Sequence, residues 1–417
     1  MSYHSILIIY LIFFGLDFLF QNYLTFLNIG EMKKNSSSVP SIFREHINFD
    51  NYKRSAEYTR VKSYFTIVSG VFSSIILLII VLSGTFGNID IFINGFGMNS
   101  YAEGLVYIFA LSLLFYIIGL PFSIYSQFKI EEEFGFNKMT IGLFIKDQIK
   151  SLILSGIILL VLLLGLFWFM DKAGPYWWII ASIGLILFQL VLSIIYPLFI
   201  APLFNKFAPL EEDDLKNLLK DLADKLKFKT TGIFIMDGSR RSGHSNAYFT
   251  GVGKSKRIVL YDTLVSILGN NQIAAVLAHE IGHYKKHHLI KGLVLSFFVT
   301  TLGFFVVNIF LNYLPLFKAF GFTRVSYHGI FVILSFAAGP FTFFLTPLFT
   351  MWSRKHEYEA DAFAAENTDY GEDLKEGLII MSKENLSNLT PHPLYSFYHY
   401  SHPTVGERIR AINKIEE

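Results

Sequence analysis

The segment Leu277–His288, LAHEIGHYKKHH, contains residues whose spacing could bind a metal ion. It includes the pattern H-E-x-x-H as His279, Glu280 and His283. In an α-helix, positions i and i+4 lie on the same face, so both imidazoles could reach one ion with Glu280 beside them. Two histidine ligands and a general base from one helical turn are typical of zinc proteases. The alternative is a helix with two surface histidines that bind nothing.

A catalytic zinc site also needs a third protein ligand and an open position for water. Glu357 and Asp361 lie one helical turn apart in the segment Ser353–Ala365, which directly follows an apolar run. We predict that Glu357 is the third ligand and that Asp361 hydrogen-bonds a ligand imidazole and fixes its tautomer. The alternative is a solvated acidic helix end. The chain has no cysteine, so any metal must bind to His, Asp or Glu, and thiolate catalysis is excluded.

The composition is that of a membrane protein. Of the 417 residues, 53% are hydrophobic and only 16% are charged, whereas soluble domains carry about 25% charged residues. The net charge of +2 and the lack of a strongly basic tract argue against a nucleic-acid partner. Seven apolar runs are long enough to cross a bilayer: Ser5–Leu27, Tyr64–Leu82, Leu105–Phe122, Leu152–Met170, Tyr176–Ile200, Leu293–Leu314 and Ile330–Thr350.

Lysine and arginine are unevenly distributed among the loops between these runs. If the loops alternate across the membrane, 32 of the 35 basic residues fall on one side and three on the other. The two short basic loops, after the first and third runs, carry seven and four of them. Because short cytosolic loops are enriched in basic residues, we predict that the N-terminus is outside or luminal. The C-terminus and the H-E-x-x-H segment are then cytosolic.

The segment Ala201–Lys291, between the fifth and sixth runs, is the main polar part of the chain. Leu215–Phe228 has leucines at helical spacing, preceded by acidic residues and followed by lysines, as the helix dipole favours. Gly232–Met236 and Arg257–Tyr261 have the composition of short strands, with Asn246–Thr250 as a third. This alternation predicts a small α+β unit.

Gly251–Lys256, between the last two strands, is predicted to be a hairpin turn. It contains GVGKS, but the first glycine of a phosphate-binding loop would fall at Tyr248, which excludes that motif. We expect Asn270–Gln272 to break the helix that follows the strands and the motif helix to begin at Ile273.

The chain therefore divides into four parts. Residues 1–200 form spans one to five with short loops, and residues 201–291 form a loop domain with a short β-sheet and the motif helix. Residues 292–352 form spans six and seven. Residues 353–417 form a tail that carries the third zinc ligand and packs against the loop domain.

Four stretches resemble the type I CAAX prenyl proteases, which are membrane-embedded zinc metalloproteases of the gluzincin kind. They extend from the third span to the tail, so the resemblance covers nearly the whole chain. They are Leu120–Lys138, Met236–Leu264, Leu277–His288 and Ser401–Ile409.

The resemblance implies a mainly α fold, in which a bundle of seven transmembrane helices encloses a water-filled chamber. An α+β gluzincin-like zinc domain lies on its cytosolic side. The resemblance also implies one Zn²⁺ per chain on His279, His283 and Glu357, with Glu280 as the catalytic base.

Five further residues take roles from the same resemblance. His402 is implied as a catalytic residue that stabilises the oxyanion, and Arg408 and His288 as supporting residues near the zinc site. Asn246 and Ala247 match the stretch whose edge strand holds an extended substrate by main-chain pairing. Without the resemblance, three of these residues have simpler interpretations. Asn246 could be a turn residue, His288 an interfacial histidine and Arg408 a solvated charge.

The implied reaction is hydrolysis of a prenylated C-terminal CaaX sequence after the lipidated cysteine, releasing the last three residues (aaX). The partners would be a prenylated or membrane-associated polypeptide and the lipid bilayer, with the enzyme a monomer. The membrane would be the endoplasmic reticulum in a eukaryote and the plasma (inner) membrane in a bacterium. Two alternatives stay open: a broad quality-control metalloprotease that needs no prenyl group, and a seven-span transporter or receptor with an incidental metal site.

Overall fold

Among the residues that the computed structural model describes, seven helical segments are long and apolar enough to cross a membrane, as the sequence predicts. The structure describes residues 1–211, 213–250 and 257–416. The first five spans contain α1 (Tyr3–Lys34), α2 (Phe49–Leu82), α4 (Ser100–Tyr125), α6 (Ile141–Lys172) and α7 (Trp177–Ile195). The sixth is α12 (His288–Phe310), and the seventh joins α14 (Tyr327–Thr342) to α15 (Thr346–Asn367).

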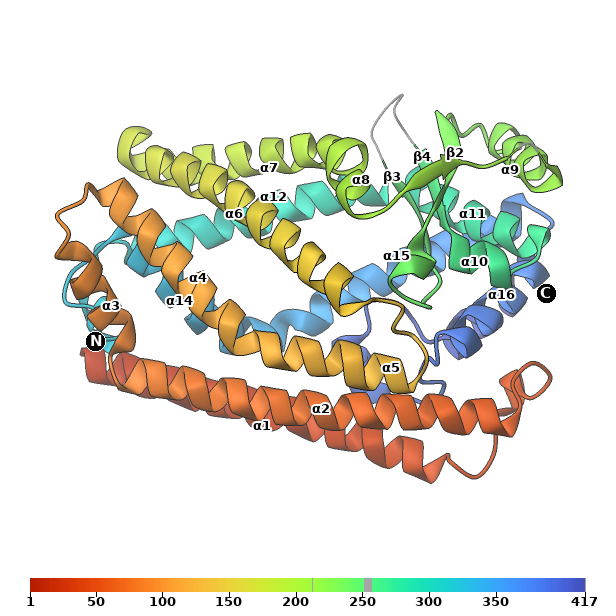
Figure 1. Ribbon diagram of the computed structural model, residues 1–417, viewed down its shortest axis with the longest axis horizontal. Coiled ribbons are helices and arrows are strands. Elements are labelled where there is room, and N and C mark those ends of the chain that lie inside the picture. The colour runs from red at the N-terminus through yellow and green to blue at the C-terminus, as the bar shows by residue number, and fades with distance from the viewer. Residues whose placement is uncertain (212, 251–256, 417) are drawn as a thin grey trace.

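These helices run along the long axis of the molecule, and the sheet, α11 and the C-terminal tail gather at one end (Figure 1). Helices α1 and α2 lie side by side along one edge, while α7 packs against α12 and α6 on the other. Helix α14 contacts both α1 and α4. Few residues of each span are buried by protein, as expected for helices that face lipid.

Several helices extend well beyond their apolar runs. Helix α2 begins at Phe49, fifteen residues before the apolar run at Tyr64, because Asn48 caps it by accepting from the Asn51 N–H at 2.8 Å. Helix α15 likewise continues from the seventh span to Asn367. This extension of α15 includes Glu357 and Asp361, which therefore lie at the end of the bundle where the loop domain is found.

The end of the bundle away from the C-terminus contains a buried ionic cluster. It lies where α3 (Thr85–Asn94) meets the loop that includes α13 (Leu314–Ala319). His328 Nε2 lies 2.7 Å from Asp90 Oδ1, and Arg324 pairs with both Asp90 and Glu103. Although burial alone would raise the pKa of Asp90, hydrogen bonds from His328 and Arg324 hold it below its usual value. The cluster joins the loop after span six to the start of span three.

A four-stranded sheet forms in the loop domain, with the order β1-β2-β4-β3. Strands β2 (Gly232–Met236) and β4 (Arg257–Tyr261) match the predicted strands, and β3 (Ala247–Thr250) begins one residue later than predicted. Pairing is parallel between β2 and β4 and antiparallel at both outer strands. The fourth strand, β1 (Phe207–Pro209), was not predicted. The predicted hairpin turn Gly251–Lys256 lies outside the described residues.

Helices pack around this sheet to form one apolar core. Helix α9 (Asp214–Lys225) buries Leu215, Leu219 and Leu222 on one face, as its leucine spacing predicts. The expected break at Asn270–Gln272 is wrong, since α11 spans Asn270–Lys285. Gly269 precedes it in extended conformation, and Gln272 caps the Gly269 N–H at 3.0 Å, so the break falls before Asn270.

Two helices of the tail pack against this core. Helix α16 (Gly371–Glu384) packs on α11, and α18 (Val405–Glu416) packs on α15 and α16. The remaining short helices are α5 (Glu131–Glu133), α8 (Ala201–Phe204), α10 (Asp262–Ile267) and α17 (Pro393–His399).

Candidate metal centre

Helices α11 and α15 approach each other closely beside the H-E-x-x-H sequence. At Gly282 a Cβ atom would lie 3.0 Å from both the Cα and the carbonyl oxygen of Ala360. A larger residue would therefore push the helices apart. This contact places the histidines of α11 opposite the carboxylates of α15.

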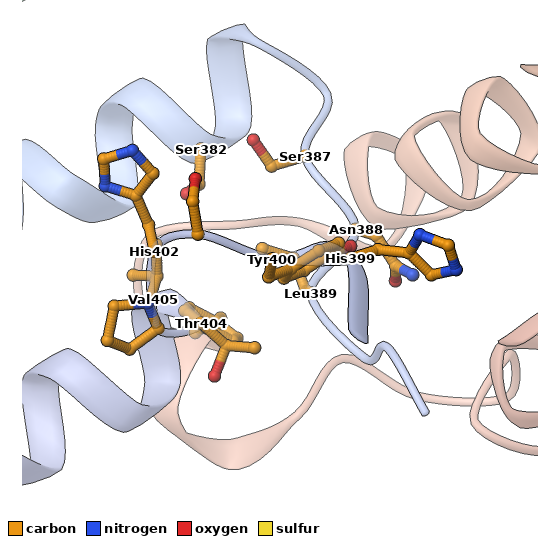
Figure 2. Close-up of a pocket in the computed structure, with 12 residues that line it drawn as sticks. Ser382, Ser387, Asn388, Leu389, His399, Tyr400, His402, Thr404 and Val405 are labelled. Carbon is orange, nitrogen blue, oxygen red and sulfur yellow. The ribbon is translucent and has the colours of Figure 1, made fainter. Parts of the chain in front are cut away.

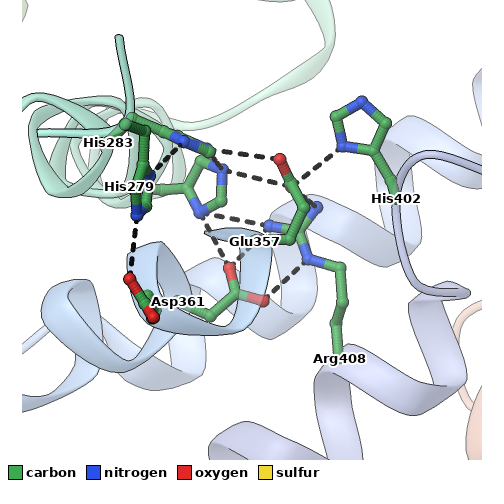
Figure 3. A network of polar contacts seen from close by, with 8 residues as sticks. His279, His283, Glu357, Asp361, His402 and Arg408 are labelled. Atoms are coloured by element: carbon green, nitrogen blue, oxygen red, sulfur yellow. Dashed lines mark hydrogen bonds and ion pairs between the residues drawn. The ribbon is translucent and has the colours of Figure 1, made fainter. Parts of the chain in front are cut away.

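The three predicted ligands converge on one point (Figure 3). The Nε2 atoms of His279 and His283 are 3.1 Å apart. Glu357 Oε2 lies 3.6 Å from His279 Nε2, and Glu357 Oε1 lies 3.3 Å from His283 Nε2. Ligands held about 2.0–2.1 Å from a tetrahedral zinc ion are separated by about 3.3 Å, so the spacing suits zinc.

The chemistry of these donors also fits a metal ion. Glu357 is 4% exposed, and its Oε2 atom is buried without a well-aligned hydrogen bond from any described residue. A buried carboxylate oxygen in that position is costly unless a cation or a donor compensates it. His279 Nδ1 is engaged on its far side, which directs the Nε2 atom toward the same point.

A buried chain of charges orients His279. Asp361 Oδ1 lies 2.8 Å from His279 Nδ1, as the sequence predicts for the carboxylate that fixes the tautomer. Arg408, from α18, donates to both oxygens of Asp361 at 2.8 and 2.6 Å. Asp361 is 1% and Arg408 8% exposed, so the pair is shielded from water. Arg408 is therefore not a solvated charge.

A second chain orients His283. His288 Nδ1 lies 2.9 Å from His283 Nδ1, and His288 Nε2 lies 3.0 Å from Glu359 Oε2. His356 stacks on His288 with ring centroids 3.9 Å apart. The sequence did not suggest Glu359 or His356 as members of the site. The one signal in the sequence is that both residues lie within one helical turn of Glu357.

Glu280 follows His279 on α11 and is partly buried. Burial raises the pKa of Glu280, the neighbouring Glu357 adds to this effect, and the two histidines oppose it. A raised pKa makes the carboxylate a stronger proton acceptor than a solvated glutamate. Its carboxylate can therefore act as a base next to the ligand histidines.

His402 approaches from the loop between α17 and α18, and its Nδ1 atom lies 2.9 Å from Glu357 Oε2. Contact with the Glu357 carboxylate raises the pKa of His402, which favours the form with two N–H donors. The imidazole is otherwise largely exposed, at 65% of its side-chain surface. It borders the centre and lines a cavity of about 390 Å³.

Asn246 and Ala247 lie at the beginning of β3, the outer strand of the sheet. The Asn246 carbonyl accepts from the Tyr261 N–H at 3.1 Å, and the Asn246 side chain is exposed. Strand β3 also contacts α11. Its free edge can accept an extended peptide by main-chain hydrogen bonds.

Known proteins match this chain over almost its full length. The family described as peptidase family M48 matches residues 209–416, and the CAAX prenyl protease N-terminal region, with five membrane helices, matches residues 28–206. CAAX prenyl protease 1 of Saccharomyces cerevisiae is 37% identical, with 96% of this chain and 94% of that protein covered. The chain belongs to the CAAX prenyl protease 1 family.

Two further relatives agree with this assignment. The CAAX prenyl protease 1 homolog of Homo sapiens is 33% identical, with 92% of this chain and 90% of that protein covered. The crystal structure of Ste24p from S. mikatae has a TM-score of 0.92 and 34% identity, and covers 98% of this chain and 99% of that one.

Family membership makes this chain a multi-pass membrane metallopeptidase, and the metal in peptidase family M48 is generally zinc. The alternative of a non-enzymatic transporter or receptor is therefore wrong. Sequence and structure agree on a mainly helical protein with seven candidate spans and a small sheet.

Replacement of Asp361 by asparagine is expected to weaken zinc binding about 10–100-fold, because partners that orient a ligand imidazole typically contribute that much to metal affinity. The asparagine keeps the shape of the side chain but removes the charge that favours the His279 tautomer. Competition with a chelator of known affinity would measure the change. Glu366→Gln is the matched control, since Glu366 is exposed on the same helix and should leave zinc affinity unchanged. Equal zinc affinity of the wild type and D361N would contradict a role for Asp361.

Proposed function

We propose that this enzyme binds one zinc ion through His279, His283 and Glu357 and hydrolyses prenylated CaaX sequences after the lipidated cysteine. The observation that carries this proposal is the convergence of two imidazole nitrogens and a buried carboxylate beside Glu280. The names of the relatives support the substrate class.

Zinc, when bound, supplies Lewis acidity that lowers the pKa of a water molecule to about 7 and polarises the scissile carbonyl. The protein residues supply the remaining steps. Glu280 accepts the proton from the water as its oxygen attacks the carbonyl carbon. The carbon–nitrogen bond then breaks, and Glu280 returns the proton to the leaving amine. No covalent bond to the protein forms.

His402 is proposed to donate an N–H to the carbonyl oxygen as negative charge develops there. Its exposed ring beside Glu357 and its raised pKa support this role. Arg408 and Asp361 hold His279 in place, while Glu359 and His288 do the same for His283.

We further propose that the centre faces the cytosol, with the N-terminus in the lumen of the endoplasmic reticulum. The asymmetry of 32 basic residues against three supports this orientation. The relatives described above are eukaryotic, which favours the endoplasmic reticulum over a bacterial membrane. A centre at the cytosolic end would let a cytosolic protein present its C-terminus while its prenyl chain stays in apolar surroundings.

Cleavage of a farnesylated peptide and of the same peptide without the lipid would test the substrate class. We expect kcat/KM to be at least about tenfold higher for the farnesylated peptide. Burial of a CH₂ group contributes about 0.8 kcal/mol, so burying two carbons of the chain already gives this factor. Glu280→Gln serves as the inactive control for contaminating proteases. Equal values of kcat/KM would favour the broad quality-control protease instead.

A further inference from the structure

Two polar cavities adjoin each other, and the first of them borders the metal centre at His402. The first, the tail cavity, has a volume of about 390 Å³ and includes His402 in its lining (Figure 2). The second, the α2 cavity, has a volume of about 380 Å³ and lies between α2 and the loop that follows α16. Ser387, Asn388 and Tyr400 line both cavities, so a peptide could extend from one to the other.

The α2 cavity is suited to an anionic group. Lys62 and His244 line it together with hydroxyl and amide side chains, and no carboxylate is among the described lining residues. Lys62 is half exposed, and its Nζ atom donates to Tyr58 Oη at 3.0 Å. Its other neighbour, Glu131, is 3.6 Å away, is not among the lining residues, and places its second oxygen 3.3 Å from His244 Nε2. Because an ammonium group has three N–H donors, Lys62 retains capacity for a further acceptor.

The direction of β3 brings one end of a bound peptide toward this cavity. Antiparallel pairing is slightly more stable than parallel pairing, so a peptide on the free edge of β3 would run opposite to it. Residues of the peptide that follow the scissile bond then lie beyond the start of β3, where Ser245 and His244 precede Asn246. Asn385 holds this segment, because its Oδ1 accepts from the Ser245 N–H at 3.0 Å and lies 3.3 Å from His244 Nδ1.

The length of the released product agrees with this path. Three extended residues span about 10 Å. Asn246 and His244 are two residues apart, so at most about 7 Å of chain separates them. A carboxylate three residues after a bond cleaved beside Asn246 would therefore reach the region of His244, which lines the α2 cavity with Lys62.

We propose that the α2 cavity binds the C-terminal carboxylate of the substrate, with Lys62 as its cationic partner. This inference rests on the proposed function, in which the last three residues are released. Lys62 would make the enzyme select a free chain end at a fixed distance from the zinc site. Charge-assisted hydrogen bonds of this kind are about twice as strong as neutral ones.

The test compares two farnesylated peptides of the same sequence, one ending in a free carboxylate and the other in a carboxamide. We expect the wild type to cleave the acid with a kcat/KM at least about tenfold higher. Lys62→Gln should bring this acid-to-amide ratio close to one, and Lys62→Arg should restore most of it. Arg60→Gln is the matched control, because Arg60 lies on the same helix in an exposed ion pair with Glu57 and should preserve the ratio.

Two results would overturn the proposal: a wild-type ratio near one, or a ratio that Lys62→Gln leaves unchanged while both rates fall. In the second case Lys62 has only a structural role. Running the same pair of peptides without the farnesyl group separates this question from the substrate class. If prenylation has no effect but the acid is still preferred, the proposed function fails while carboxylate binding stands.

Discussion

Replacement of Glu280 by glutamine is expected to lower kcat by about 10²–10⁴-fold while zinc stays bound. General acid–base catalysis typically contributes a factor of this size. Glutamine has nearly the same shape but cannot accept the proton from the attacking water. His279, His283 and Glu357 provide the three converging ligand atoms, and Glu280 is not among them, so metal content should not change. Cleavage of a farnesylated peptide and the zinc content per mole of protein would be measured on the same preparation.

Glu366→Gln provides the control for this experiment, since it makes the same chemical change at an exposed position of α15. Both variants should elute as the wild type does in detergent and bind zinc with the same stoichiometry. Proteolysis by E280Q at the wild-type rate would contradict the assignment of the base. Loss of zinc from E280Q would show instead that Glu280 helps to hold the metal.

The sequence was most informative where a local pattern determines both structure and chemistry. The i, i+4 spacing of His279 and His283 predicts a shared helical face, and their Nε2 atoms are 3.1 Å apart. Glu357 and Asp361 could be selected because charge asymmetry placed the end of the seventh apolar run on the same side as the motif. The length of the apolar runs likewise predicted the seven spans, and residue composition predicted three of the four strands.

Features that depend on the path of the chain could not be predicted. The contact between His283 and His288 requires the chain to reverse at His287, which has a left-handed φ of 58°. Only after that turn does Glu359 of α15 reach His288. The residue pattern could not predict such a turn. A non-glycine residue rarely adopts a positive φ, and does so here because the surrounding structure holds it in that conformation.

The apolar runs also did not predict how far each helix extends outside the membrane. Charged side chains do not end a helix, so α2 continues fifteen residues before its apolar run. Lys62 lies in this extension, two residues before Tyr64, and hydropathy alone marks it only as a loop cation. Lys62 lines the α2 cavity together with His244 because α2 packs against the tail.

Replacement of His283 by alanine is expected to weaken zinc binding by more than the 10–100-fold expected for D361N, and to abolish proteolysis. Loss of a direct ligand leaves two protein donors, fewer than the three that a catalytic zinc site uses. A readout independent of activity is available, since a metal that binds only the folded protein stabilises it. At a free zinc concentration 100 times the Kd, this stabilisation is about 2.7 kcal/mol. Adding zinc to the metal-free protein should therefore raise the Tm of the wild type and not that of H283A.

His287→Ala is the matched control, because His287 is exposed four residues further along and its side chain lies outside the ligand set. It should retain both the zinc-dependent rise in Tm and the proteolytic activity. If H283A and H287A respond to zinc alike, the metal does not bind at the proposed centre. If H283A loses activity but keeps the full rise in Tm, His283 acts in the reaction rather than as a ligand, because the stabilisation depends only on binding to the folded state.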